Sequence, residues 1–154
     1  MSGPLAPGSA LPEVEFDGPD GRTTLDAIRE GRPLVVAFYT EDRTPLCTAQ
    51  LCAFRDDFEL IDELGAAFVG VSADGAASQA SFREEQGFPF PLLADEELAL
   101  ARAFGVVDEA AKRSVRAIFV TDASGSIVEA IPYYNPSNGQ QYQAVFAALG
   151  MDLS

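Results

Sequence analysis

Two uninterrupted apolar runs stand out in the first half of the chain. Residues 34–39 read Leu-Val-Val-Ala-Phe-Tyr, and residues 67–72 read Ala-Phe-Val-Gly-Val-Ser. Runs of this length, without alternation between apolar and polar residues, are typical of strands that are buried on both faces. We therefore predict two central strands in a sheet that is covered on both sides.

Between these runs the apolar spacing changes to that of a helix. Apolar residues recur every three or four positions over residues 48–64, which predicts one amphipathic helix that ends at Gly65. The residues of this apolar stripe are Leu51, Phe54, Phe58, Ile61 and Leu64. Three further helices, each followed by a glycine, are predicted over residues 78–86, 96–104 and 141–149, the second with Asp95 as its N-cap.

Shorter elements are predicted before the first apolar run. Residues 13–16 alternate like a short strand, and the turn-forming residues 17–21 predict a hairpin toward residues 22–25. Residues 26–30 are expected to form one helical turn.

A second strand pair is predicted late in the chain. Residues 116–121 and 126–131 form two strands joined by a turn over 122–125. Strands that alternate with helices predict an α/β fold with a central mixed β-sheet flanked by helices. We expect residues 1–154 to form a single domain, with residues 1–11 as a loose N-terminal arm.

Composition excludes several classes of function. Acidic residues number 24 against 10 basic ones, and the resulting net charge of −14 argues against binding to nucleic acid or to an anionic membrane. The absence of histidine excludes catalytic triads and metal sites that need imidazole. No apolar run reaches the roughly 20 residues of a membrane helix, and the first residues lack the features of a signal peptide, so we expect a cytoplasmic protein.

The chain has two cysteines, Cys47 and Cys52, and both follow the first apolar run, where a strand gives way to a helix. A helix start offers free backbone N–H groups and the positive end of the helix dipole, which favour thiolate over thiol. A Cys-x4-Cys pair in a protein expected to be cytoplasmic is more typical of a redox site than of a structural disulfide.

Four segments, in the same order and spacing, resemble the peroxiredoxins of the alkyl hydroperoxide reductase / thiol-specific antioxidant family, above all the bacterioferritin-comigratory (Q-type) branch. These segments are residues 38–52, 70–74, 88–95 and 116–127. The resemblance implies a thioredoxin-like fold and a thiol peroxidase without a cofactor. It also implies hydrogen peroxide and alkyl hydroperoxides as substrates, a thioredoxin-like dithiol reductant, and a monomer or weak homodimer.

The same resemblance assigns different roles to the two cysteines. It implies that Cys47 is the peroxidatic cysteine, whose thiolate attacks a peroxide and becomes a sulfenic acid. It implies that Cys52 is the resolving cysteine, which forms a disulfide with Cys47. For each of them the structural alternative is a small buried side chain of the core.

Three more residues receive roles from the resemblance. Thr44 is implied to hydrogen-bond the thiolate and the peroxide, although a helix-capping hydroxyl is the alternative. Arg116 is implied to supply positive charge to the site, although it could instead form a surface ion pair. Arg43 and Arg113 compete for that cationic role. Gln50 is either a residue that orients the arginine or an exposed helix residue.

Two positions depart from the family pattern. Thr40 stands where the family usually has proline, and Leu46 precedes the reactive cysteine where this branch often has glycine. We expect Thr40 to remove a rigid turn residue and to lower the rate. A redox sensor with little turnover therefore remains an alternative, whereas a disulfide oxidoreductase is disfavoured because Cys-x-x-Cys is absent.

The spacing of the two cysteines adds a mechanical requirement. On an ideal helix, residues five apart have Cα atoms roughly 8.6 Å from each other. A disulfide needs a Cα separation of at most about 7 Å. We therefore predict that the first turns of the helix unwind before Cys47 and Cys52 bond.

Overall fold

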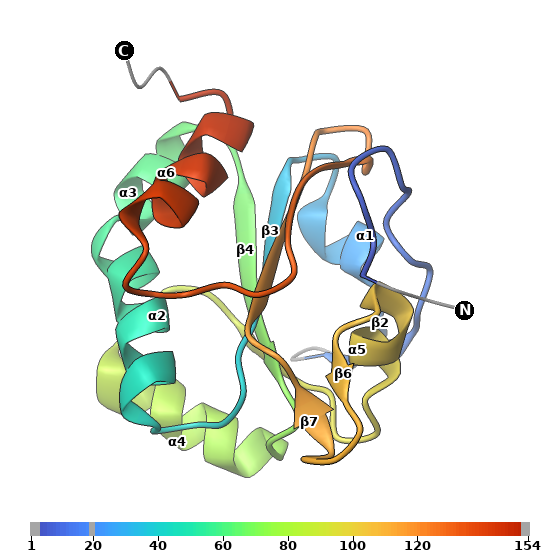
Figure 1. Ribbon diagram of the computed structural model, residues 1–154, viewed down its shortest axis with the longest axis vertical. Coiled ribbons are helices and arrows are strands. Elements are labelled where there is room, and N and C mark those ends of the chain that lie inside the picture. The colour runs from blue at the N-terminus through green and yellow to red at the C-terminus, as the bar shows by residue number, and fades with distance from the viewer. Residues whose placement is uncertain (1–3, 19–20, 152–154) are drawn as a thin grey trace.

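The computed structural model describes residues 4–18 and 21–151, and its centre is one five-stranded sheet (Figure 1). The strands are β3 (Leu34–Phe38), β4 (Ala67–Ser72), β5 (Leu92–Ala94), β8 (Ala117–Thr121) and β9 (Ile127–Ile131). Their order across the sheet is β5-β4-β3-β8-β9. Strands β5, β4 and β3 run parallel, whereas β8 is antiparallel to both of its neighbours. The predicted mixed sheet is confirmed, and so are its two buried central strands.

Helices cover both faces of this sheet, which is the predicted thioredoxin-like arrangement. They are α1 (Leu25–Arg29), α2 (Pro45–Asp56), α3 (Phe58–Glu63), α4 (Ala76–Gln86), α5 (Ala99–Phe104) and α6 (Gly139–Ala148). Figure 1 shows α2, α3 and α6 on one side of the sheet and α1 and α5 on the other. Within the described part of the chain, no helix combines the length and the apolar character needed to cross a membrane.

Strand β3 divides the core into two halves because its side chains alternate between the two faces. Val35 and Ala37 belong to the apolar cluster that includes Phe54 of α2. Val36 and Phe38 belong to the opposite cluster, beneath α1 and α5. Since every residue of β3 is buried, the end of this strand is a fixed point for the segment that follows it.

Two short hairpins lie outside the main sheet. They pair β1 (Phe16–Gly18) with β2 (Gly21–Thr23), and β6 (Val107–Asp108) with β7 (Arg113–Ser114). The first hairpin is confirmed, but its strand begins at Phe16 rather than at residue 13, and turn residues 19–20 lie outside the described residues. The second hairpin was not predicted, because its strands have only two residues each.

The prediction of one helix over residues 48–64 is wrong in two respects. The structure begins α2 three residues earlier, at Pro45, and separates α2 from α3 at Asp57, whose φ of −105° and ψ of 17° depart from helical values. At this break the Tyr142 hydroxyl lies 2.9 Å from the carbonyl oxygen of Ala53 and 2.5 Å from a carboxylate oxygen of Asp57. These two groups at the end of α2 are thus partnered from α6, a segment far away in the sequence.

The helix predicted over residues 96–104 is shorter in the structure, where α5 begins at Ala99. Leu98 has a left-handed conformation, with φ of 61°, and this interrupts the helical backbone before α5. The predicted N-cap is therefore wrong, because Leu98 and not Asp95 is the N-cap residue. The Asp95 carboxylate still accepts hydrogen bonds from the N–H groups of Leu100 and Ala101 at 3.0 and 2.9 Å.

The loose arm predicted for residues 1–11 is wrong for its described part. The N–H of Leu5 donates to the carbonyl oxygen of Phe104 at 3.0 Å, and the N–H of Leu11 donates to Gly125 at 2.9 Å. The Leu11 side chain is also buried. Backbone pairing and apolar burial therefore hold this segment against the domain.

Replacing Phe54 by alanine is expected to destabilise the protein by about 3–5 kcal/mol, because it removes a large buried ring and leaves a cavity. Phe54 is fully buried, and its ring centroid lies 4.9–6.3 Å from those of four other aromatic residues. Urea unfolding at equilibrium measures the change. Tyr133→Ala is the matched control, because the Tyr133 side chain is 73% exposed and its loss should change the free energy of unfolding little.

Candidate active site

Cys47 lies in the first turn of α2, at the third helical position. Thr44 is the N-cap residue, in an extended conformation, and Pro45 follows at the first helical position, where its missing N–H does no harm. The Cys47 side chain is fully buried. Its sulfur therefore lies near the positive end of the helix dipole and away from bulk water.

Three donor groups surround the Cys47 sulfur. The Thr40 hydroxyl is 3.0 Å from Sγ, the Thr40 backbone N–H is 3.4 Å away, and Nη2 of Arg116 is 3.4 Å away. Thr40 follows β3, Arg116 precedes β8, and the pairing of Phe38 with Ala117 keeps these two ends together. The site is thus assembled from the end of β3, the start of α2 and the distant residue Arg116.

These contacts have an electrostatic consequence for Cys47. Burial raises the pKa of the thiol, but hydrogen bonds from the Thr40 side chain, the Glu41 backbone and Arg116 outweigh burial and lower the pKa below its ordinary value. The Thr44 hydroxyl donates its one proton to the carbonyl oxygen of Glu41 at 3.1 Å and not to the sulfur. The site therefore favours the thiolate, which is the nucleophilic form of cysteine.

Of the three arginines considered from the sequence, Arg116 is the one that contacts Cys47. Arg43 instead forms an ion pair with Glu85 at 3.0 Å. Arg113 pairs with Glu41 at 3.1 Å. The two competing arginines are thus engaged with carboxylates around the site and not with its sulfur.

The segment between β3 and α2, residues 40–44, is held by a buried polar network. The Asp42 carboxylate accepts hydrogen bonds from the hydroxyls of Tyr39 at 2.7 Å and Ser78 at 2.6 Å. The Asp42 N–H donates to the carboxylate of Asp74 at 2.8 Å. Burial raises the pKa of Asp42. This network fixes the segment that carries Thr40 and Thr44 over the cysteine.

Gln50 is buried rather than exposed, with 1% of its surface accessible. Its amide nitrogen donates to the carbonyl oxygen of Phe38 at 3.4 Å. Among the described residues, Gln50 Oε1 and Arg116 Nε are buried side-chain atoms without a hydrogen-bond partner. The structure therefore contains no hydrogen bond through which Gln50 orients Arg116.

Cys52 is half-buried on the same helix, and neither cysteine is in a disulfide. Its thiol donates to the side-chain oxygen of Gln86, at the end of α4, at 3.5 Å. The Arg55 guanidinium donates to the main-chain carbonyl oxygen of Gln86 at 2.6 Å. In this state Cys52 faces α4 and not Cys47.

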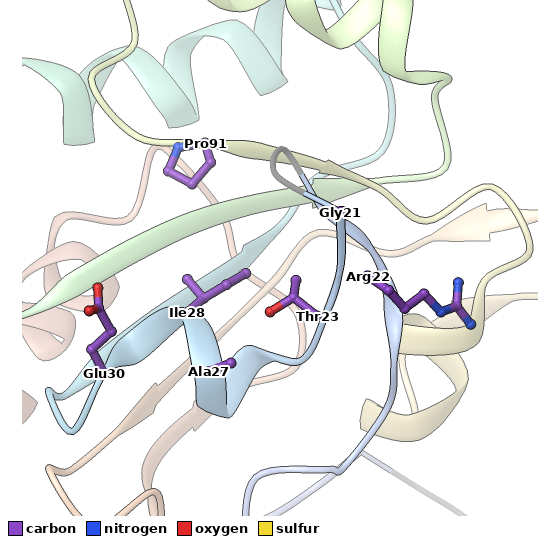
Figure 2. Close-up of a pocket in the computed structure, with 7 residues that line it drawn as sticks. All are labelled: Gly21, Arg22, Thr23, Ala27, Ile28, Glu30 and Pro91. Carbon is purple, nitrogen blue, oxygen red and sulfur yellow. The ribbon is translucent and has the colours of Figure 1, made fainter.

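A surface pocket of about 380 Å³ lies apart from the cysteines (Figure 2). Its lining residues are Gly21, Arg22, Thr23, Ala27, Ile28, Glu30 and Pro91. No residue that contacts Cys47 is among them. We therefore take the buried sulfur of Cys47, rather than this pocket, as the candidate active site.

Sequence reasoning missed the contribution of Thr40. From the sequence, Thr40 was expected only to remove a rigid turn residue and to lower the rate. In the structure, its backbone N–H and its hydroxyl both contact the Cys47 sulfur. No local pattern reports this contact, because it depends on how the end of β3 meets the start of α2.

Comparison with known proteins gives consistent results. Residues 6–130 match the model of the AhpC/TSA family. The chain is 39% identical over 128 residues to the chloroplastic Peroxiredoxin Q of Oryza sativa subsp. japonica, a match that covers 82% of this chain and 59% of the relative. The chain thus spans about three fifths of the length of this curated relative.

Solved structures show the same similarity. Peroxidoxin BcpB from Mycobacterium tuberculosis superposes with a TM-score of 0.83 at 29% identity, covering 96% of this chain and 98% of that protein. Peroxiredoxin Q of Xanthomonas campestris superposes with a TM-score of 0.75 at 34% identity, covering 89% of each chain.

Replacing Arg116 by methionine is expected to raise the pKa of Cys47 by about one unit or more, because a positive charge within hydrogen-bonding distance stabilises a thiolate. The thiolate absorbance at 240 nm, titrated in a Cys52→Ser background, measures the shift. Arg113→Met is the matched control, because it removes the same charge from a residue that pairs with Glu41 instead. Equal shifts in the two variants would contradict a specific role of Arg116.

Proposed function

The chain belongs to the AhpC/TSA family, and on that premise we propose that it is a thiol-dependent peroxidase that reduces hydrogen peroxide and organic hydroperoxides through Cys47. The observation that carries the proposal is the buried Cys47 sulfur, which has three donor groups within 3.4 Å at the start of a helix. An inert core cysteine needs no such set of donors.

In the proposed reaction the Cys47 thiolate attacks one oxygen of the peroxide. An S–O bond forms as the O–O bond breaks, so the sulfur is oxidised to a sulfenic acid and the peroxide is reduced. The leaving oxygen takes a proton from solvent and departs as water or an alcohol. Arg116 stabilises the negative charge that develops on the oxygens, and the Thr44 hydroxyl exchanges its hydrogen bond to the Glu41 carbonyl for one to the bound peroxide.

Cys52 is the proposed resolving cysteine. Its thiol attacks the sulfenic sulfur of Cys47, which forms a disulfide and releases water, and a dithiol reductant of the thioredoxin type then reduces the disulfide. The thiol of Cys52 is half-buried and bonds to Gln86 in the reduced state. Resolution therefore requires this contact to break.

Resolution also requires a change in α2, because Cys47 and Cys52 lie in one continuous helix, Pro45–Asp56. At this spacing an intact helix keeps the two Cα atoms roughly 8.6 Å apart, beyond the reach of a disulfide. We therefore propose that the first turns of α2 unwind after oxidation.

The cellular setting is also a proposal. We propose the cytoplasm, because a Cys-x4-Cys pair used for redox chemistry suits a reducing compartment. A monomer or weak homodimer remains our prediction for the assembly. A redox sensor with little turnover is the alternative function, and steady-state peroxide consumption distinguishes it from an enzyme.

The two cysteines are expected to respond differently to substitution. Cys47→Ser should abolish rapid peroxide reduction, because the nucleophile is lost. Cys52→Ser should retain the first oxidation but lose turnover with thioredoxin. Stopped-flow kinetics with hydrogen peroxide measure the first step, and a coupled thioredoxin assay measures turnover. Peroxide consumption by Cys47→Ser would contradict the assignment, and undiminished turnover by Cys52→Ser would exclude its role in resolution.

Oxidation of the wild type is expected to yield a Cys47–Cys52 disulfide together with faster amide exchange at the start of α2. Mass spectrometry identifies the bond, and hydrogen exchange followed along the helix reports its unwinding. Cys52→Ser, oxidised to the same degree, is the control, because it cannot form the bond. A disulfide in a helix that stays fully protected would rule out the unwinding step.

A further inference from the structure

Thr40 occupies the position at which the family usually has proline, and Tyr39 separates it from the end of strand β3 at Phe38. Proline has neither a backbone N–H nor a side-chain hydroxyl. Threonine has both, and here both lie against the Cys47 sulfur, at 3.4 Å and 3.0 Å. Two of the three Sγ contacts within 3.4 Å therefore come from a residue that the family pattern does not supply.

The backbone leaves the Thr40 N–H free for this contact. The preceding residue, Tyr39, uses both of its backbone groups, because its N–H donates to Val71 at 3.0 Å and its carbonyl oxygen accepts from the Ser114 hydroxyl at 3.0 Å. Thr40 thus begins the segment beyond the sheet, where its N–H turns to the sulfur.

The segment after Thr40 is held in place independently of the cysteine. Asp42 is bonded to Tyr39 and Ser78, and Arg43 is bonded to Glu85. Hydrogen bonds of Tyr39 before it and of Asp42 after it therefore fix the position of Thr40. Its donors are oriented before a negative charge forms on Cys47. Preorganised donors of this kind stabilise charge more effectively than mobile ones.

We propose that Thr40 is a further catalytic residue of this site, which donates two hydrogen bonds to the Cys47 thiolate, one from its backbone N–H and one from its hydroxyl. The inference deepens the proposed function and rests on it for its biological meaning. The contacts themselves concern the thiol alone, so they can be measured without peroxide.

The hydroxyl adapts to both states of the sulfur. It accepts a hydrogen bond from the protonated thiol and donates one to the thiolate, because a hydroxyl is both donor and acceptor. The bond to the thiolate is the stronger one, since charge-assisted hydrogen bonds exceed neutral ones. Thr40 therefore shifts the equilibrium toward the ionised form.

This shift has a kinetic counterpart. The nucleophilicity of a thiolate falls as its pKa falls, with a Brønsted slope of about 0.4–0.5. Thr40 should therefore increase the fraction of thiolate at low pH and reduce the reactivity of each thiolate at high pH. Thr40 should therefore increase the observed reaction rate below the pKa of Cys47 and decrease it above that pKa.

Other charged groups around the site are already partnered, so they do not replace Thr40. The Asp42 carboxylate accepts hydrogen bonds from the hydroxyls of Tyr39 and Ser78 and makes no hydrogen bond with the Cys47 sulfur. Glu41 forms an ion pair with Arg113, and Glu85 forms one with Arg43. The Asp74 carboxylate accepts a hydrogen bond from the Ser72 hydroxyl. Arg116 is the one cationic side chain in contact with Cys47 among the described residues.

The test compares Thr40→Val, Thr40→Ser and Thr40→Pro in a Cys52→Ser background. Valine keeps the shape and the N–H but removes the hydroxyl, serine keeps both donors, and proline removes both. Thiolate absorbance at 240 nm gives the pKa of Cys47, and alkylation by iodoacetamide across pH gives its reactivity. Urea unfolding of each variant shows that it is folded.

Thr40→Val should raise the pKa of Cys47 by about one unit, since it removes one charge-assisted hydrogen bond. At alkaline pH its fully ionised thiolate should react about threefold faster than the parent, and below both pKa values about threefold slower. Thr40→Pro should shift the pKa further. Thr40→Ser should resemble the parent.

An unchanged pKa in folded Thr40→Val would overturn the inference. So would a loss of alkylation rate by the same factor at every pH, because that is the result expected of a residue that merely packs over the cysteine. Peroxide consumption by the wild type is measured separately. If it is absent while the pKa shifts occur, the proposed function fails and the role of Thr40 at the thiolate stands.

Discussion

Everything at this site depends on keeping a negatively charged sulfur inside the protein. A buried charge is strongly unfavourable unless hydrogen bonds and opposite charges compensate for lost water. Cys47 is fully buried, and its compensation comes from Thr40, from Arg116 and from the start of α2. Burial raises the pKa of the Cys47 thiol, but the compensating hydrogen bonds outweigh burial and bring the pKa below its ordinary value. Without histidine in the chain, fixed donors and one guanidinium perform this task.

The central sheet brings these donors together. Strands β3 and β8 are neighbours. Thr40, shortly after the end of β3, and Arg116, immediately before β8, therefore lie near the same sulfur. Acidic residues have a structural part in this arrangement. Asp42 and Asp74 link the segment before α2 to α4 and β4, and Glu41 and Glu85 engage the arginines that do not contact the cysteine. Part of the chain's large negative charge therefore supports the frame of the site.

The sequence sufficed for features that depend on short-range patterns. Continuous apolar runs identified β3 and β4 because these strands are buried on both faces, and the glycine at residue 87 marked the end of α4 because it adopts a left-handed conformation there. The break at Asp57 was missed because the apolar spacing continues through it, and the groups at the break are partnered by Tyr142 from a distant helix. The same holds for Thr40, whose effect on Cys47 depends on tertiary contact rather than on neighbouring residues.

The break between α2 and α3 also gives the reactive helix two unequal ends. Its C-terminal end is anchored, because Phe54 is packed among aromatic rings and the Ala53 carbonyl lies against the Tyr142 hydroxyl. Its N-terminal end has the polar contacts of Cys47 with Thr40 and Arg116 in addition to the apolar packing of Leu51. Cys52 is adjacent to the anchored end, whereas Cys47 lies in the first turn. In the proposed resolution step, unwinding at the N-terminal end would carry the oxidised Cys47 sulfur toward Cys52, while Phe54 and the aromatic rings around it keep their packing.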